Sequence, residues 1–315
     1  MANHKILTFE NISLQEFDSD AELIPLLTPE DEAEMNNEEL PASLSILPLR
    51  NTVLFPGVVI PISAGRDKSI KLINDANAGS KIIGVVAQKN EGDEDPTKND
   101  IHKIGTVARI LRVLKMPDGN ITVILQGKKR FEIDAVISEK PYIRANVKEV
   151  SEKRPGKHDT EFLAIVDSIK ELAIQIIKES PNIPTEATFA IRNIESQSFL
   201  INFVSSNMNL SVSEKQDLLT MNALKERALE TLRFMNVELQ KLELKNDIQS
   251  KVRFDLDQQQ REYFLHQQMK TIQEELGGNP MEQEVVDLKE RAKTKKWSKE
   301  VADAFAKDMA KVLNR

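Results

Sequence analysis

The sequence contains no cysteine among its 315 residues. That absence excludes disulfide bonds, thiolate zinc sites and thiol catalysis, and it fits a reducing compartment. No apolar run approaches the roughly 18 residues that cross a bilayer, and the N-terminal MANHKILTFE lacks the apolar core of a secretory signal. Aromatic residues make up 5% of the chain and charged residues 30%, a balance typical of long solvated helices. We therefore expect a soluble, cytoplasmic protein.

Motifs that carry chemistry are also missing. The chain has no G-x-x-x-x-G-K-[ST] phosphate loop, no G-x-G-x-x-G loop and no H-E-x-x-H motif. Its histidines lack the spacing of metal ligands; they are His4, His102, His158 and His266. With 50 Asp and Glu residues, a pair that resembles a catalytic acid and base would arise by chance. We assign no catalytic, cofactor-binding or metal-binding residue, and we expect no enzyme activity from this chain alone.

Negative charge is concentrated at the N-terminus. Residues 1–40 carry 11 acidic side chains and one lysine, a net charge of −10, whereas the rest of the chain sums to +3. We predict a disordered acidic tail over residues 1–40. Its apolar patch at residues 23–27 is either a docking motif or, as we favour, part of a solvated tail. The near-neutral remainder argues against a dedicated nucleic-acid surface.

Residues 41–152 have the texture of a β-rich lobe. Runs of Val and Ile separated by turn residues predict seven short strands, at 44–47, 58–62, 81–88, 105–116, 121–126, 130–137 and 142–150. A helix is predicted over residues 66–78, and Pro117-Asp118-Gly119-Asn120 predicts a hairpin turn. The lobe has the size of an ordinary domain.

Helical periodicity follows from residue 153 onward. Residues 162–177 predict an amphipathic helix capped by Asp159, and shorter helices complete a small bundle over residues 153–210. Ser211 and Glu214 form a capping box.

No proline or glycine then occurs before Gly277, while apolar residues recur every three or four positions. We predict one very long coiled-coil-type helix as a connector over residues 211–277, with any bend near 254–260. Residues 278–315 predict a further helical segment. Its pattern stops at Arg315 without a cap, so we expect a longer protein to continue from there.

An apolar loop joins the first two predicted strands. It contains Val53, Leu54, Phe55 and Pro56. Loops are normally polar, so an apolar loop is either folded onto its lobe or available to a partner. We favour packing, because Pro56-Gly57 also suits a tight turn, and we keep these four residues as candidate substrate contacts.

Three stretches carry a family resemblance. Leu47-Pro48-Leu49-Arg50, followed by the apolar loop, Pro61 and Gly65-Arg66, resembles the opening of the N-terminal domain of the ATP-dependent Lon proteases, members of the AAA+ class. Residues 210–219 resemble the same family. The long predicted helix carries a further motif of that family, to which we give a structural role; it includes Arg261, Glu262, Tyr263, Phe264, Gln268, Met269, Leu276 and Gly277. The resemblance covers about residues 41–315.

The resemblance implies both a fold and a function. It implies a PUA-like pseudo-barrel for the lobe, and thus an α+β chain of barrel, small helical bundle and very long helix. Lon proteases are homohexameric, ATP- and Mg-dependent serine endopeptidases with a Ser–Lys dyad. This chain would be their non-catalytic substrate-recognition and assembly region, truncated before the ATPase and protease domains. Its partners would be misfolded, unfolded or degron-bearing proteins and further copies of itself, with no membrane.

A second hypothesis belongs to a different class. The chain would be a free-standing coiled-coil scaffold whose PUA-like lobe reads peptide or RNA. Few aromatic residues and a near-neutral body count against RNA binding. Steeply salt-dependent RNA binding would support it.

Overall fold

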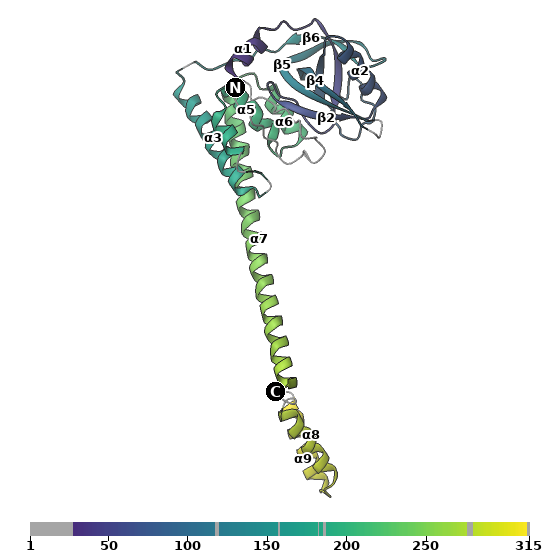
Figure 1. The fold of residues 1–315 in the computed structure, drawn as a ribbon, viewed down its shortest axis with the longest axis vertical. Coiled ribbons are helices and arrows are strands. Elements are labelled where there is room, and N and C mark those ends of the chain that lie inside the picture. Colours follow the sequence, from purple (N-terminus) through teal and green to yellow (C-terminus); the bar gives the residue numbers. More distant parts are fainter. Residues whose placement is uncertain are drawn as a thin grey trace. The chain divides into compact units, whose positions relative to one another are not determined.

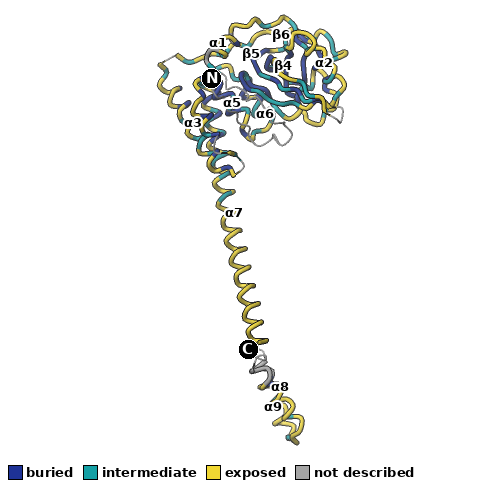
Figure 2. The backbone as a smooth tube through the Cα atoms, in the orientation of Figure 1, coloured by how far each residue is buried: buried dark blue, intermediate teal, exposed yellow. Residues whose placement is uncertain are grey.

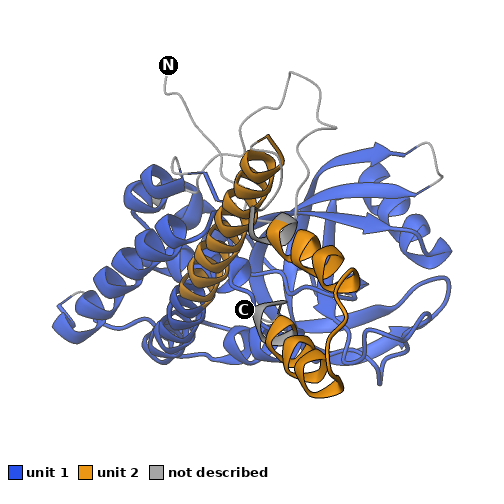
Figure 3. Ribbon diagram, turned by 90° about the horizontal axis from the view of Figure 1, so that it is seen from below, with its two compact units in different colours: residues 1–244 blue, residues 245–315 orange. Residues whose placement is uncertain are grey.

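The computed structural model describes residues 28–116, 120–156, 158–181, 183–184, 187–275 and 280–313 (Figure 1). The chain divides into two compact units, residues 1–244 and residues 245–315 (Figure 3). The first unit holds a β barrel and a helical bundle, and the second holds further helices. This composition confirms the predicted α+β class. Two of the predicted segments, residues 1–40 and 211–277, are corrected below, and the other predicted boundaries stay predictions.

Six strands form one sheet in the described part of the chain. They are β1 (Ser43–Leu49), β2 (Val59–Ala64), β3 (Ile82–Ala87), β4 (Ile104–Lys115), β5 (Ile121–Ser138) and β6 (Arg144–Glu149). Their order is β2-β5-β4-β3-β1-β6, and β5 also pairs with β6, so five strands close into a barrel. Among the strand pairs, only β1 and β3 run parallel. Parallel neighbours need a crossover connection, which β2 and helix α2 (Asp67–Ala78) provide between them.

Strand β5 corrects the sequence prediction of two separate strands. It runs unbroken for 18 residues: its first half pairs with β2 and its second half with β6. Gly127 lies between these halves, where its N–H and carbonyl bond to Val58 and Gly57. A Cβ atom at residue 127 would lie 2.2 Å from the carbonyl oxygen of Phe55. The glycine therefore permits a close backbone approach rather than ending the strand.

The hairpin between β4 and β5 agrees with the predicted turn. Lys115 pairs with Ile121, and the Met116 N–H donates to the Asn120 carbonyl over 2.9 Å. Residues 117–119 of the predicted turn lie outside the described residues.

The barrel and the bundle share apolar packing. Leu72 and Ile73 of α2 pack with buried barrel residues such as Leu125. The loop residues Val53 and Phe55 instead belong to the same buried cluster as the apolar side chains of the bundle. The loop after β1 thus shares one buried cluster with the bundle, and buried residues occur in both parts of the first unit (Figure 2).

Four helices make up the bundle that follows the barrel. They are α3 (Thr160–Glu179), α4 (Ala187–Asn193), α5 (Gln197–Asn207) and α6 (Val212–Thr220). The predicted cap of the first helix is confirmed, since the Asp159 side chain accepts from the Phe162 N–H over 3.0 Å. The capping box of Ser211 and Glu214 is confirmed as well.

The long helix begins later than predicted. The capping box starts α6, which ends at Thr220, and a separate helix, α7 (Leu224–Glu275), follows. Met221 is extended, and the backbone of Lys153 bonds to Asn222 and Leu224 on either side of residue 223. The break is thus stabilised by partners about 70 residues away, so the local sequence holds no signal for it.

Helix α7 confirms a very long helix of 52 residues. It continues through residues 254–260, where we expected a bend. Beyond Met235 most of its side chains are exposed (Figure 2). Helices α8 (Pro280–Lys293) and α9 (Lys299–Leu313) follow, with Trp297 and Phe305 in edge-to-face contact at 4.8 Å. Within the described residues, no helix combines the length and apolar character that crossing a membrane requires.

The N-terminal prediction is wrong for residues 28–40. A helix, α1 (Pro29–Asn37), begins with a capping box between Thr28 and Asp31. Its Met35 is only 7% exposed and belongs to the bundle's apolar cluster. Composition alone pointed to disorder, but this single apolar side chain and a few charged contacts dock the helix. Residues 1–27, including the apolar patch at 23–27, lie outside the described residues.

Candidate functional site

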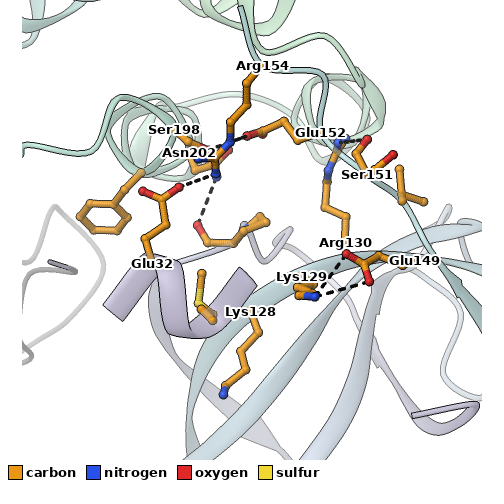
Figure 4. Close-up of a pocket in the computed structure, with 14 residues that line it drawn as sticks. Glu32, Lys128, Lys129, Arg130, Glu149, Ser151, Glu152, Arg154, Ser198 and Asn202 are labelled. Atoms are coloured by element: carbon orange, nitrogen blue, oxygen red, sulfur yellow. Dashed lines mark hydrogen bonds and ion pairs between the residues drawn. The ribbon is translucent and has the colours of Figure 1, made fainter. Parts of the chain in front are cut away.

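A cavity of about 350 Å³ lies where the barrel, the bundle and α1 meet (Figure 4). Its lining comes from α1, the apolar loop, β5, the segment after β6 and α5. Seven lining residues are charged, four basic and three acidic; they are Glu32, Lys128, Lys129, Arg130, Glu149, Glu152 and Arg154. The cavity is therefore mainly a polar junction, with apolar contributions from Met35, Pro56 and Phe199.

Arg227 anchors one side of this junction from inside α7. Its side chain is fully buried. Its Nη1 donates to Glu152 over 2.9 Å and to Asn202 over 3.0 Å, and its Nη2 donates to the Met221 carbonyl over 2.6 Å. Burial lowers the pKa of Arg227, and the Glu152 carboxylate opposes that shift. A buried cation is tolerated here because both terminal nitrogens are hydrogen-bonded and one of them meets a carboxylate, although the buried Nε has no hydrogen-bond partner among the described residues.

Arg130 reaches the same point from β5. Its Nη1 donates to the carbonyls of Leu219 and Met221 over 2.8 and 2.9 Å. Burial, and then the positive charge of Arg227, lower the pKa of Arg130 to about 10, against the opposing effect of Glu152. Both arginines thus hold the carbonyl of Met221, at the break between α6 and α7.

Glu152 connects the two arginines with the rim of the cavity. Besides Arg227, it accepts from the Ser198 hydroxyl over 3.0 Å and from Arg154 Nε over 3.3 Å. Lys128 and Lys129 pair with Glu38 and Glu149 (Figure 4 shows the second pair). Most charges of the junction are paired, and its contacts hold the surrounding elements in position.

The structure buries most of the apolar loop. Val53 and Leu54 are each 2% exposed and Phe55 is fully buried. This burial agrees with the packing that we favour, and the contact of these side chains with a substrate stays a prediction. Pro56 is half-buried, lines the cavity, and accepts from Asn202 Nδ2 through its carbonyl over 3.3 Å. Substrate contact stays a prediction for Pro56.

The described residues of the long-helix motif lie on the part of α7 that belongs to the second unit, and the cavity lining includes none of them. Arg261, Glu262, Tyr263, Phe264, Gln268 and Met269 are all exposed. Tyr263 is 68% exposed and accepts from Gln267 Nε2 over 3.3 Å. Their structural role is not tested by these contacts. Leu276 and Gly277 lie outside the described residues.

The network of charged and polar side chains at the junction was not predicted from the sequence. Arg130, Glu152, Asn202 and Arg227 come from four separate segments, and no short motif joins them. One signal was present: Arg227 stands within the helical repeat of Leu224, Ala228, Thr231 and Met235, which are all buried. A cation inside a buried repeat indicates a partner from elsewhere in the fold.

The described residues hold no group of three His, Asp or Glu side chains that could bind a metal ion. The Ser198 hydroxyl, which lines the cavity, is engaged with Glu152. We therefore derive no catalytic step from this junction.

Comparison with known proteins identifies relatives. The family model of the ATP-dependent protease La (LON) substrate-binding domain matches residues 43–237. The Lon protease of Flavobacterium johnsoniae is 80% identical over 312 residues, which cover 99% of this chain and 38% of that protein. The Lon protease of Cytophaga hutchinsonii is 50% identical over 291 residues, or 92% of this chain and 36% of that protein. The chain thus spans less than two fifths of the length of these curated relatives.

A solved structure supports the fold. The N-terminal domain of a Lon protease from the Mycobacterium avium complex superposes with a TM-score of 0.52 at 21% identity, covering 62% of this chain and 98% of that chain. The family model extends over the barrel, the bundle and the first part of α7. The resemblance drawn from the sequence motifs is thereby confirmed, and the chain belongs to the family of Lon protease substrate-binding domains.

Proposed function

We propose that this chain is the non-catalytic substrate-recognition and assembly region of an ATP-dependent Lon protease. The complete protein would degrade misfolded and degron-bearing regulatory proteins in the cytoplasm, as a homohexamer. The observation that carries the proposal is the match of residues 43–237 to the Lon substrate-binding domain. The 80% identity to one curated Lon protease over nearly the whole chain supports it.

The exposed apolar side chains of α7 give the proposal physical content. Twelve large apolar residues of this helix are exposed; they are Leu229, Val237, Leu244, Ile248, Val252, Phe254, Leu256, Tyr263, Phe264, Leu265, Met269 and Ile272. Such surface suits contact with unfolded protein or with another copy of the helix. Each contact would be weak alone, and several linked copies would add avidity.

ATP and magnesium belong to the complete protein in this proposal. The 315 residues contain no G-x-x-x-x-G-K-[ST] phosphate loop, so nothing in them fits a nucleotide site of that kind. Peptide-bond cleavage would equally fall to a Ser–Lys dyad outside these residues. The chain alone is expected to turn over neither ATP nor casein.

A binding comparison tests the proposal. One fluorescently labelled model protein is offered to the chain in its native form and as a permanently unfolded variant. We expect at least tenfold tighter binding of the unfolded form, with a Kd of roughly micromolar or weaker, because a single copy lacks avidity. Equal binding of both forms would contradict substrate recognition by this chain.

The RNA-binding alternative is not favoured. In the barrel, several lysines are already paired with carboxylates, for example Lys129 with Glu149 and Lys148 with Asp134. Such pairs reduce the positive charge that a phosphate backbone would meet. A titration with single-stranded RNA at two salt concentrations measures any such binding directly.

A further inference from the structure

We propose that the surface beneath α1 is a binding site for acidic protein segments that carry a bulky apolar residue, and that α1 occupies it as an internal competitor. We call this surface the α1 groove and define it by Pro56, Lys128, Arg154, Ser196 and Phe199. The inference rests on the proposed function, because it names a class of segment that the substrate-binding unit would take.

Helix α1 presents a three-residue pattern to the groove. Glu32 pairs with Arg154 and accepts from Ser196, Met35 is buried, and Glu38 pairs with Lys128. Glu32 and Met35 are three residues apart, which places them on one face of α1, and Glu38 is the extended residue that directly follows the helix. The other face is open to solvent, since Asp31, Ala33 and Glu34 are exposed. The groove thus contacts a carboxylate, an apolar side chain and a second carboxylate, which in the sequence form the pattern E-x-x-M-x-x-E.

The groove requires an acidic occupant. The Lys128 side chain is only 7% exposed, and Glu38 is its one ion-pair partner among the described residues. In the docked state this nearly buried ammonium group depends on the Glu38 carboxylate, and loss of α1 leaves Lys128 free to pair with another anion. Arg154 differs, because it also contacts Glu152 at 3.3 Å and remains oriented when Glu32 departs. Without α1, Arg154 is therefore still held by Glu152, whereas Lys128 lacks a carboxylate partner among the described residues.

Docking of α1 leaves space beside it. The cavity of about 350 Å³ is lined by Glu32 and Met35 of α1 and also by Pro56, Phe199 and Asn202. A segment with a larger apolar residue than methionine would fill more of this volume. Among the α1 side chains that the structure describes, Met35 is the one in the buried apolar cluster, so these side chains hold α1 by few groups and it can be exchanged.

Charge favours the same assignment. Residues 1–40 carry a net charge of −10, and the rest of the chain carries +3. An acidic segment tethered next to the groove has a high effective concentration there and lowers the apparent affinity of a free competitor. External segments of the same pattern would therefore bind more tightly once α1 is released.

The test uses the full chain with its α1 contacts altered. The variant Glu32→Gln, Met35→Ala, Glu38→Gln releases α1, and the matched control Glu34→Gln, Glu39→Gln removes the same charge from exposed positions. The probe is a fluorescein-labelled peptide with the sequence of residues 28–39. We expect the released variant to bind the probe at least tenfold more tightly than the parent, and the control to match the parent. A probe carrying Met35→Ala should bind the released variant at least tenfold more weakly than the parent probe.

Equal probe affinity for the released variant and the parent would overturn the proposal, as would equal affinity for the two probes. Adding Lys128→Gln to the released variant should remove the gain, whereas Lys68→Gln on α2 should keep it. The permanently unfolded model protein is titrated in parallel. If it binds but neither the release of α1 nor an excess of probe alters its affinity, the proposed function stands and the groove assignment fails. If the probe behaves as expected and the unfolded protein does not bind, the groove assignment stands and the proposed function fails.

Discussion

The guanidinium of Arg227 and the carboxylate of Glu152 lie 2.9 Å apart, although 75 residues separate them in the chain. Arg227 belongs to the beginning of α7, and Glu152 belongs to the segment that leaves the barrel after β6. The Arg227 guanidinium also holds the carbonyl of Met221, and Arg130 of β5 holds that same carbonyl. The pair therefore fixes the start of the long helix to the barrel within the first compact unit.

Loss of the Arg227 side chain should strongly destabilise this unit. In the variant Arg227→Met, Glu152 loses its buried cation, and the carbonyl of Met221 and the amide of Asn202 each lose a donor. Breaking a buried ion pair by removal of one partner lowers the free energy of unfolding by about 3–5 kcal/mol. Urea denaturation, followed by circular dichroism, measures the change.

Arg233→Met is the matched control for this experiment. Arg233 pairs with Glu230 on the exposed side of the same helix, so its loss should leave the unfolding midpoint unchanged within error. Arg227→Met combined with Glu152→Gln should be less destabilising than the sum of the two single changes, because the residues share one interaction. Equal effects of Arg227→Met and Arg233→Met would contradict the anchoring role.

Gly127 should not tolerate a larger residue. In Gly127→Ala the new Cβ would meet the Phe55 carbonyl oxygen at 2.2 Å and its carbon at 3.0 Å, and both are backbone atoms that cannot rotate away. We expect a loss of about 1–3 kcal/mol in the free energy of unfolding, as for overpacking in a core. Gly92→Ala is the control, because nothing lies within 4 Å of a Cβ there. Thermal unfolding that is the same for both variants would exclude this explanation of the unbroken β5.

The local elements of the fold could be predicted because their signals are local. Periodicity and caps located α3 and every strand except β5 to within a few residues, and Asp159 and Ser211 cap where predicted. The break at residues 221–223 could not be predicted, since it depends on Arg130, Arg227 and Lys153 from distant segments. Helix α1 was missed for the same reason, because its docking depends on Lys128 and Arg154 rather than on its own composition.

At the candidate site, too, only the features with a local signal could be predicted from the sequence. The apolar loop was found from its composition, and packing was the favoured interpretation, which the burial of Phe55 agrees with. The cavity beside it is built from α1, β5 and α5, which only the tertiary fold brings together. The apolar loop could be found because its residues are atypical for a loop. The residues that line the cavity are ordinary within their own segments, so their proximity could not be predicted from the sequence.

The Asp159 cap should make stability depend on pH. The hydrogen bond from the Phe162 N–H, followed by the contact with Lys225, lowers the pKa of Asp159. A carboxyl group whose folded pKa lies below its unfolded value of about 3.9 stabilises the fold above that pH. This contribution is lost as the pH falls through the folded pKa.

Asp159→Asn isolates the charge, because asparagine retains a capping oxygen. The variant should unfold at a lower temperature than the parent at pH 7, and the difference should shrink below about pH 3.9. Asp167→Asn, an exposed change on the same helix, serves as the control. A difference between Asp159→Asn and the parent that stays constant from pH 7 to pH 2.5 would show that charge is not responsible.

The exposed apolar stripe of α7 should mediate self-association. Leu265 and Met269 are 54% and 53% exposed and stand four residues apart on one helix face. Leu265→Glu with Met269→Glu should weaken self-association at least tenfold, measured by sedimentation over a range of concentrations, because charge opposes apolar contact between helices. The pair Gln267→Glu and Thr271→Glu adds the same charge to adjacent exposed positions and should have a smaller effect. A parent chain that remains monomeric at every concentration would contradict the assembly role of this helix.

Substitution of Phe55 distinguishes a role in packing from a role in substrate binding. It is fully buried within the cluster that joins the barrel loop to the bundle, so Phe55→Ala should lower the free energy of unfolding by about 3–5 kcal/mol. Binding of the unfolded model protein, corrected for the fraction of folded chain, should not change. Pro56→Ala should show the opposite pattern, because Pro56 is half-buried and faces the cavity. If Phe55→Ala instead weakens binding per folded molecule while stability is retained, the loop must open to meet its substrate, and the packed conformation is then only one state of this surface.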